Sequence, residues 1–126
     1  MSKTKESKLE EQVEKFMKSK GIWQLARYQA QSNQNGLPDR IYLYKGYLLG
    51  LELKTDEGTP TKLQLKKIDE INYNGGIGLI VRDVKVIEQL IKLIDAYKSY
   101  TITLNDSILE CLKEWMEANG YKGIDE

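Results

Sequence analysis

The stretch that decides the fold is residues 39–54, which read DRIYLYKGYLLGLELK. Two apolar runs, Arg40–Tyr44 and Leu48–Leu53, stand on either side of Lys45-Gly46. β-branched, aromatic and leucine side chains around a central glycine are typical of two antiparallel strands joined by a tight turn. These residues therefore predict a β-hairpin.

The register of this hairpin decides whether two carboxylates meet. If Tyr44 faces Tyr47 across a two-residue turn, Asp39 lies directly opposite Glu52; a four-residue loop gives the same pairing and an odd loop shifts it by one. Directly opposed residues have Cβ atoms roughly 4.5–5.5 Å apart, and side chains alternate between faces, so Lys54 emerges on the same face as Glu52. Two carboxylates at this distance repel each other, and a hard divalent cation such as Mg²⁺ removes the repulsion.

A solvated strand face is the plainer interpretation of the same residues, with Lys54 in a cross-strand ion pair. Acidic-x-Lys triplets arise by chance in a chain so rich in charge, and two others occur, at 6–8 and 83–85. Neither of those lies on a predicted strand. Gly50, on the same face as Glu52, indicates either the close approach of a ligand or backbone, or a bulge.

Hydrophobic periodicity and turn residues predict the elements outside the hairpin. Thr59 as N-cap and Pro60 as the first helical residue mark the start of one helix. The predicted elements are a helix over 7–20, a strand over 22–29, a helix from Pro60 to about Asn74, a strand over 77–81 and a helix from Asp83. With the hairpin they give the order α-β-β-β-α-β-α, a mixed α/β fold with helices around a small sheet.

Residues 99–126 form an extension to a domain that spans residues 1–98. Residues 100–104 are compatible with a strand or a connector. Ser107 fits a capping box that opens a final helix, and the apolar side chains of that helix lie along one face. We expect this face, which includes Trp115 and Met116, either to pack on the same domain or to form a symmetric interface between two copies.

Composition excludes several kinds of catalytic site. The 126 residues include 19 lysines and arginines, 19 aspartates and glutamates, and no histidine. Histidine-based triads and histidine-ligated zinc are therefore excluded, and a single cysteine rules out an internal disulfide framework. The charged N-terminus predicts no signal peptide, and no apolar run is long enough to span a bilayer. We expect an intracellular protein without a membrane partner.

The polar residues around the hairpin resemble the motif of the PD-(D/E)xK nuclease superfamily. The resemblance rests on GLPDRI at residues 36–41, on Glu52-Leu-Lys54 after a gap of twelve residues from Asp39, and on Gln64. In particular, the chain is similar to the VRR-NUC branch of small stand-alone phage and bacterial nucleases, which are similar to Holliday-junction resolvases. The resemblance covers about residues 9–92. It implies a restriction-endonuclease-like mixed sheet flanked by helices, followed by a C-terminal helical extension.

The resemblance also implies a role for each matching residue. Asp39 and Glu52 would bind Mg²⁺ or Mn²⁺ together with the Leu53 carbonyl. Lys54 would position the attacking water and stabilise its deprotonated form. Gln64 would orient Lys54 or the scissile phosphate, although a lone glutamine on a helix is also compatible with simple exposure.

An acidic residue on the first helix often joins the metal site in this family. Glu10 is favoured by its spacing from Gly21, and Glu11 is the alternative. A glutamate in a helical charge run is equally compatible with a solvated position.

Contacts with nucleic acid must be local, because the net charge of the chain is zero. We predict a basic rim around the hairpin and the end of the second helix, formed by Arg27, Arg40, Lys45, Lys62 and Lys66. Scattered solubilising charges are the alternative interpretation.

The implied activity is the hydrolysis of DNA phosphodiester bonds by an endonuclease that depends on Mg²⁺ or Mn²⁺. By resemblance alone, branched DNA such as a Holliday junction or a flap is the expected substrate, and a homodimer in the cytoplasm of a bacterium or phage-infected cell is the expected form. The alternative is a non-catalytic nuclease-like module that binds DNA or serves in phage assembly.

Overall fold

The computed structural model describes residues 4–27, 35–97 and 101–123. The elements of the described residues are α1 (Lys5–Ser19), β1 (Trp23–Arg27), β2 (Arg40–Tyr44), β3 (Tyr47–Leu53), α2 (Lys62–Tyr73), β4 (Ile77–Val81), α3 (Val84–Tyr97) and α4 (Thr101–Ala118). This order confirms the predicted mixed α/β fold. Within the described residues, no helix has both the length and the hydropathy needed to cross a bilayer.

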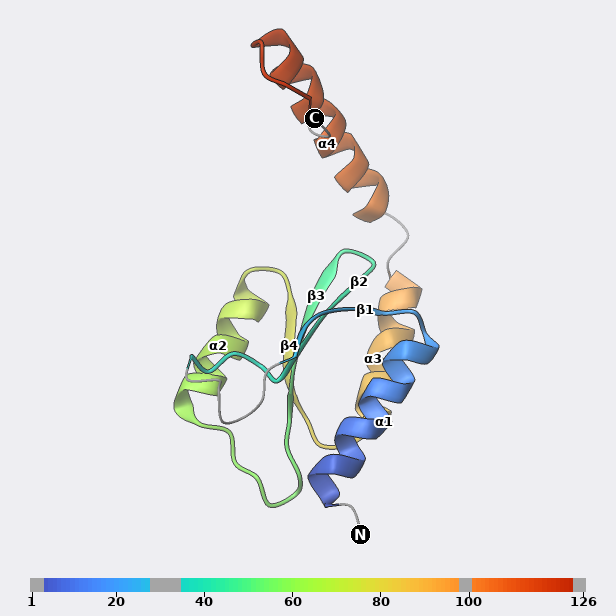
Figure 1. Ribbon diagram of the computed structural model, residues 1–126, viewed down its shortest axis with the longest axis vertical. Coiled ribbons are helices and arrows are strands. Elements are labelled where there is room, and N and C mark those ends of the chain that lie inside the picture. Colours follow the sequence, from blue (N-terminus) through green and yellow to red (C-terminus); the bar gives the residue numbers. More distant parts are fainter. Residues whose placement is uncertain (1–3, 28–34, 98–100, 124–126) are drawn as a thin grey trace.

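The four strands form one mixed sheet in the order β1-β2-β3-β4. β1, β2 and β3 are antiparallel neighbours, and β4 runs parallel to β3. A parallel neighbour requires a crossover connection, which α2 supplies. Helices α1 and α3 cover one face of the sheet and α2 covers the other (Figure 1).

The β2–β3 hairpin has the predicted register. Tyr44 pairs with Tyr47, and Arg40 pairs with Leu51 at the other end of the ladder. Lys45 and Gly46 have φ values of 48° and 85°, as a two-residue turn of the type that matches strand twist requires. Continuing this register by one residue sets Asp39 against Glu52.

Alternation along β3 separates the core from the candidate site. Leu49, Leu51 and Leu53 are buried in the core that α1 and α3 complete. Gly50 and Glu52 face α2 instead. A Cβ on Gly50 would lie 2.7 Å from the Ile71 Cδ1 atom and 3.0 Å from the Pro38 Cγ atom. The glycine is therefore explained by the close packing of these side chains, and the β2–β3 pairing contains no bulge.

Two boundaries differ from the prediction. The N-cap of α2 is Thr61, not Thr59, because Thr61 and Gln64 form a reciprocal capping box that outweighs the proline signal. The predicted strand over 22–29 is described as Trp23–Arg27, and its last two residues, Tyr28 and Gln29, lie outside the described part of the chain.

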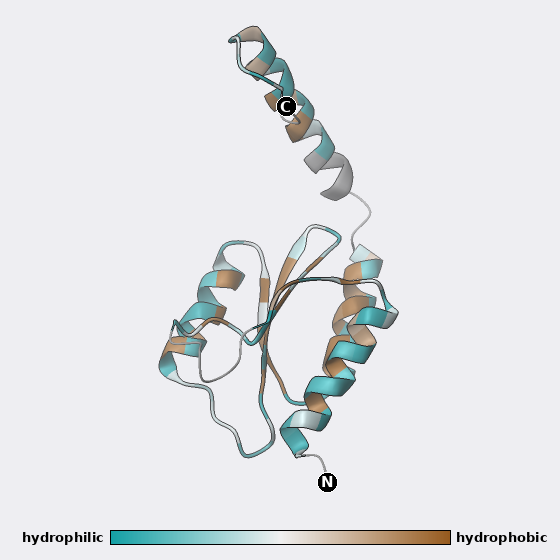
Figure 2. Cartoon of the chain, in the orientation of Figure 1, coloured by the Kyte–Doolittle hydropathy of each residue, from teal (hydrophilic) through white to brown (hydrophobic). Residues whose placement is uncertain are grey.

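The helix of the C-terminal extension begins earlier than predicted. α4 is one helix from Thr101, so the predicted strand or connector is wrong over 101–104, as is the N-cap at Ser107, and residue 100 lies outside the described residues. A Ser-x-x-Glu pattern also suits solvent-facing positions inside a helix, and here it occupies such positions. α4 extends away from the sheet and its flanking helices (Figure 1), and it carries apolar segments along its length (Figure 2). The domain boundary at residue 98 stays a prediction.

Candidate active site

Reciprocal hydrogen bonds join Asp39 to Glu52 at the open end of the hairpin. The Asp39 amide donates to Glu52 Oε2 at 3.0 Å, and the Leu53 amide donates to Asp39 Oδ2 at 3.1 Å. Each carboxylate thus accepts a hydrogen bond from a main-chain N–H of the opposite segment, just beyond the Arg40–Leu51 pair that ends the β2–β3 pairing. Both acidic side chains are fixed by backbone, which holds their positions more tightly than side-chain contacts alone would.

Glu52 is the most deeply buried carboxylate of this group, with 1% of its surface exposed. Besides the Asp39 amide, it accepts a 2.6 Å hydrogen bond from Gln64 Nε2 on Oε1. The Lys54 Nζ atom lies 3.5 Å from the same oxygen. A charge so deeply buried requires several donors, and these donors come from Asp39, Gln64 and Lys54, which the sequence predicts as site residues.

Gln64 links the site to the start of α2. Its Oε1 atom accepts a 2.8 Å hydrogen bond from the Thr61 amide, while its Nε2 atom donates to Glu52. Its own amide donates to Thr61 Oγ1 at 3.1 Å. Each half of the Gln64 amide group is therefore engaged, and the helix cap sets the orientation of the group that contacts Glu52.

Burial raises the pKa of both carboxyl groups. For Glu52, the neighbouring Asp39 charge raises the pKa further, and the Asp39 amide and Lys54 counteract only part of this shift. For Asp39, the Leu53 amide, Lys54 and Arg40 lower the pKa without offsetting burial. Two desolvated carboxylates that repel each other gain most from a bound cation.

The donor set at this position suits a hard divalent ion. Asp39 and Glu52 offer carboxylate oxygens, and Mg²⁺ is often held by one or two carboxylates while it keeps several waters. Within the described residues, no cluster of three acidic, histidine or cysteine side chains is suitable for a metal ion. The two carboxylates would therefore need main-chain or water oxygens to complete the shell, as expected for the Leu53 carbonyl.

Glu10 and Glu11, the candidates on the first helix for a further metal ligand, stay predictions, and each has other neighbours in the structure. Glu10 Oε2 lies 3.8 Å from the Arg40 guanidinium, on the α1 side of the sheet, whereas Glu52 faces α2. Glu11 borders a shallow exposed surface with Lys8, Gln12 and Lys15. The helical carboxylate whose charge raises the pKa of Asp39 is Glu6, which sequence reasoning missed, although it stands one turn before Glu10.

Arg40 is buried and does not belong to an exposed basic rim. Only 2% of its surface is exposed, and its guanidinium lies 3.2 Å from Glu14 Oε1 on α1. It also donates to the Asp39 carbonyl at 3.4 Å. This burial contradicts the predicted DNA contact, because the alternation that turns Glu52 toward α2 turns Arg40 toward α1.

The other predicted DNA-binding residues are exposed but do not form one patch. Lys45 lies at the hairpin turn, at the opposite end of β2 from Asp39, where it pairs with Asp95 at 2.7 Å. Arg27 pairs with Glu14 at 3.2 Å. Lys62 and Lys66 are exposed on α2 near Gln64. Only the two α2 lysines therefore lie along the helix that supplies a site residue.

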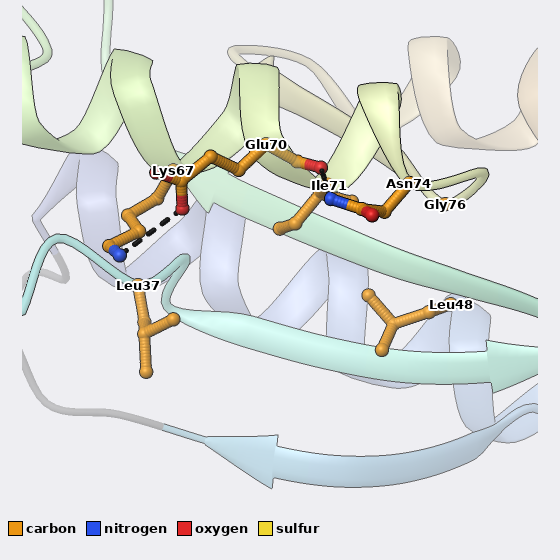
Figure 3. A pocket seen from close by; sticks show the side chains of 7 residues that line it. All are labelled: Leu37, Leu48, Lys67, Glu70, Ile71, Asn74 and Gly76. Atoms are coloured by element: carbon orange, nitrogen blue, oxygen red, sulfur yellow. Dashed lines mark hydrogen bonds and ion pairs between the residues drawn. The ribbon is translucent and has the colours of Figure 1, made fainter.

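A pocket of about 310 Å³ lies farther along α2 (Figure 3). Leu37, Leu48 and Ile71 form its apolar wall, and a Lys67–Glu70 ion pair at 3.2 Å stands at its rim. Asp39, Glu52, Lys54 and Gln64 do not line this pocket. The pocket is thus a neighbour of the candidate site and not its centre.

Two solved structures share this fold. One, described as "VRR_NUC domain", has a TM-score of 0.58 at 20% identity, over 71% of this chain and 97% of that chain. The other, described as "VRR_NUC domain protein", has a TM-score of 0.55 at 15% identity, over 74% of this chain and 89% of that chain. No family model matches the sequence, and no curated protein is significantly similar to it. More than a quarter of this chain has no counterpart in the first structure.

Proposed function

We propose that this chain is a nuclease of the VRR-NUC type, which hydrolyses phosphodiester bonds in DNA with the help of Mg²⁺ or Mn²⁺. The observation that carries the proposal is the convergence of Asp39, Glu52, Lys54 and Gln64 at the open end of the hairpin, within hydrogen-bonding or ion-pair distance of a neighbour in the set. The shared fold of the VRR_NUC domain structures supports it.

Asp39 and Glu52 would hold the metal ion, with the Leu53 carbonyl as a further ligand. When bound, such an ion polarises phosphate oxygens and lowers the pKa of a coordinated water. The raised pKa values of both carboxyls are consistent with a site built for a cation, since each would ionise more readily beside one. Glu6 or Glu10 on α1 is the candidate for a further acidic contribution.

Lys54 and Gln64 lie next to Glu52, from where they would position the attacking water and the scissile phosphate. The Lys54 ammonium group would hold the attacking water and stabilise its deprotonated form. The Gln64 amide, fixed by the cap of α2, would keep Glu52 and Lys54 in place beside the scissile phosphate. No histidine is required for any of these roles.

DNA would approach along α2, where Lys62 and Lys66 are exposed near Gln64. Phosphate contacts of this kind give affinity without sequence preference. A preference for branched DNA, such as a four-way junction or flap, follows from the family resemblance, as does action in the cytoplasm of a bacterium or phage-infected cell.

One observation favours a second function, a non-catalytic module that binds DNA or serves in assembly. Both oxygens of Glu52 already have donors, from Asp39, Gln64 and Lys54. A network that is satisfied in this way has no need of a metal ion for stability. The two functions differ in whether the DNA backbone is cut.

Cleavage of supercoiled plasmid and of a synthetic four-way junction, in Mg²⁺, Mn²⁺ and EDTA, tests the proposal. We expect metal-dependent cutting, and we expect Lys54→Ala to lower the cleavage rate about 100-fold or more while changing DNA affinity less than about twofold. Lys92→Ala, an exposed lysine on α3, is the matched control and should cut normally. Binding without cutting in every metal would favour the non-catalytic module.

A further inference from the structure

An apolar ridge along α4 stays largely exposed among the residues that the structure describes. It consists of Ile108, Leu109, Leu112 and Trp115, which are between 43% and 65% exposed. Their spacing places them on one side of the helix. An amphipathic helix gains most of its stability by burying such a side, so the ridge indicates a partner surface.

The end of α4 holds the largest side chain of this ridge in place. Gly120, with a φ of 78°, reverses the chain after the helix, and the Tyr121 amide donates to the Met116 carbonyl at 2.9 Å. Tyr121 then stacks on Trp115, with ring centroids 5.4 Å apart. The indole is therefore ordered before any partner binds, which lowers the entropic cost of docking.

A matching apolar groove lies on the domain itself, between α3 and β4. It has a volume of about 450 Å³ and is lined by Leu79, Lys85, Val86, Gln89, Leu90 and Leu93. α3 buries Ile87, Ile91 and Ile94 in the core, so the groove uses a second apolar stripe of the same helix. β4 is an edge strand of the described sheet, and an uncovered edge is a position that proteins commonly protect.

We propose that two copies of this chain exchange α4, so that the ridge of each copy packs into the α3–β4 groove of the other. The exchange is reciprocal and closed by a two-fold axis, as in most homodimers. Because the groove lies on α3 and β4 while Asp39 and Glu52 face α2, the exchange leaves both candidate active sites uncovered. The proposal is independent of the proposed nuclease activity.

The buried area favours this exchange over a simple pair of α4 helices. Fully burying a leucine-sized side chain removes roughly 60–120 Å² of apolar surface from water. The four ridge residues together with Val86 and Leu93 are each about half-exposed, so each copy would bury roughly 200–400 Å² of apolar surface. With a polar rim of similar size, the area per copy would be roughly 400–800 Å², and the upper end of this range reaches the roughly 800 Å² per partner of stable interfaces. Two paired ridges alone would bury only the four ridge residues of each copy, roughly two thirds of that apolar surface.

The first test measures the oligomeric state of the protein by light scattering after gel filtration and by sedimentation equilibrium. We expect a dimer, and we expect Leu112→Glu to weaken the dimer about 100-fold or more. Lys113→Glu, which places the same residue on the polar side of α4, should remain dimeric. Circular dichroism and the domain's unfolding transition show that both variants fold. A wild type that stays monomeric at high concentration would overturn the proposal.

The single cysteine of the chain, Cys111, makes the second test specific for the groove. It is exposed on α4 beside Leu112, and Gln89→Cys introduces a thiol into the groove. With a short bis-maleimide, we expect this variant to form a cross-linked dimer and the wild type to form none. A cross-link within one chain would show that α4 folds over its own α3, and a Cys111–Cys111 cross-link in the wild type would show that the ridges pair directly. Either result, or a dimer without the groove cross-link, contradicts the exchange.

Discussion

Glu52 is an ionisable residue at a buried position of β3, where an apolar side chain would also fit the alternation of the strand. It is buried, hydrogen-bonded by the Asp39 amide and by Gln64, and close to a second carboxylate. Its pKa and that of Asp39 are raised, because burial and mutual repulsion disfavour the charged forms. Functional sites commonly carry such destabilising charge, and the rest of the fold must offset it.

Replacing Asp39 with asparagine removes one of the two repelling charges and keeps an oxygen that can accept from the Leu53 amide. We expect the metal-free variant to melt about 3 °C higher than the metal-free wild type. Thermal unfolding with and without Mg²⁺ measures this, and added Mg²⁺ should stabilise only the wild type. An equal effect of Mg²⁺ on both proteins would place the ion elsewhere.

The same carboxyl groups set the pH dependence of stability. Because their pKa values are higher in the folded than in the unfolded protein, the folded state binds protons more tightly, and stability rises as the pH falls toward those values. We expect the metal-free wild type to be more stable at about pH 5 than at about pH 7.5, and Asp39→Asn to show a smaller difference. The lowered pKa of Asp95 acts in the opposite direction only at lower pH. Urea unfolding at both pH values checks the sign.

At the scale of elements, the N-terminus of α2 connects helix stability to the site. Thr61 and Gln64 satisfy main-chain donors of the first turn in a capping box. The side chain of Gln64 then reaches Glu52 on β3. One residue thus serves both the helix and the candidate site, and its two roles can be separated by comparing it with its capping partner.

Thr61→Ala and Gln64→Ala each remove part of the capping box, and we expect each to lower the free energy of unfolding by about 1 kcal/mol. Only Gln64→Ala also removes a donor from Glu52, so only this variant should lower the cleavage rate, by about tenfold or more. Urea unfolding and cleavage kinetics measured on the same preparations check both expectations. An equal loss of cleavage in Thr61→Ala would mean that Gln64 acts only through the helix cap.

At the scale of the whole molecule, the sheet separates two environments, and Arg40 connects α1 to the strand that begins at the site. Its guanidinium lies 3.2 Å from Glu14 Oε1, and it donates to the Asp39 carbonyl. Arg27 lies at the same distance from the same Glu14 oxygen, yet its side chain is 53% exposed. The two arginines therefore form a matched pair that differs in burial.

Arg40→Ala leaves a cavity between α1 and the sheet and removes a buried partner of Glu14. We expect it to lower the free energy of unfolding by about 3 kcal/mol, at the lower end for a broken buried ion pair because Glu14 is partly solvated. Arg27→Ala should cost less than about 1 kcal/mol. Urea unfolding of both variants provides the comparison, and similar losses would show that burial does not control the strength of this link.

Local patterns are sufficient to predict the hairpin and the pairing that it imposes. Lys45-Gly46 favours a two-residue turn, the turn sets the register, and the register sets Asp39 against Glu52. The period of two along β3 then assigns the leucines to the core and Glu52 to the other face. Each step depends on residues that are neighbours in the sequence or are joined by a short turn.

Contacts between distant segments were decided only by the tertiary structure. The burial of Arg40 against Glu14 and the position of Glu10 beside Arg40 depend on which face of the sheet α1 covers. The contact between Gln64 and Glu52 depends on how the α2 crossover returns to the sheet. The capping pattern at Ser107 does not mark the start of α4, because a Ser-x-x-Glu sequence suits solvent-facing positions inside a helix as well as its first turn. Spacing along a chain specifies strand register and alternation, whereas burial and long-range pairing depend on the layers that surround each strand.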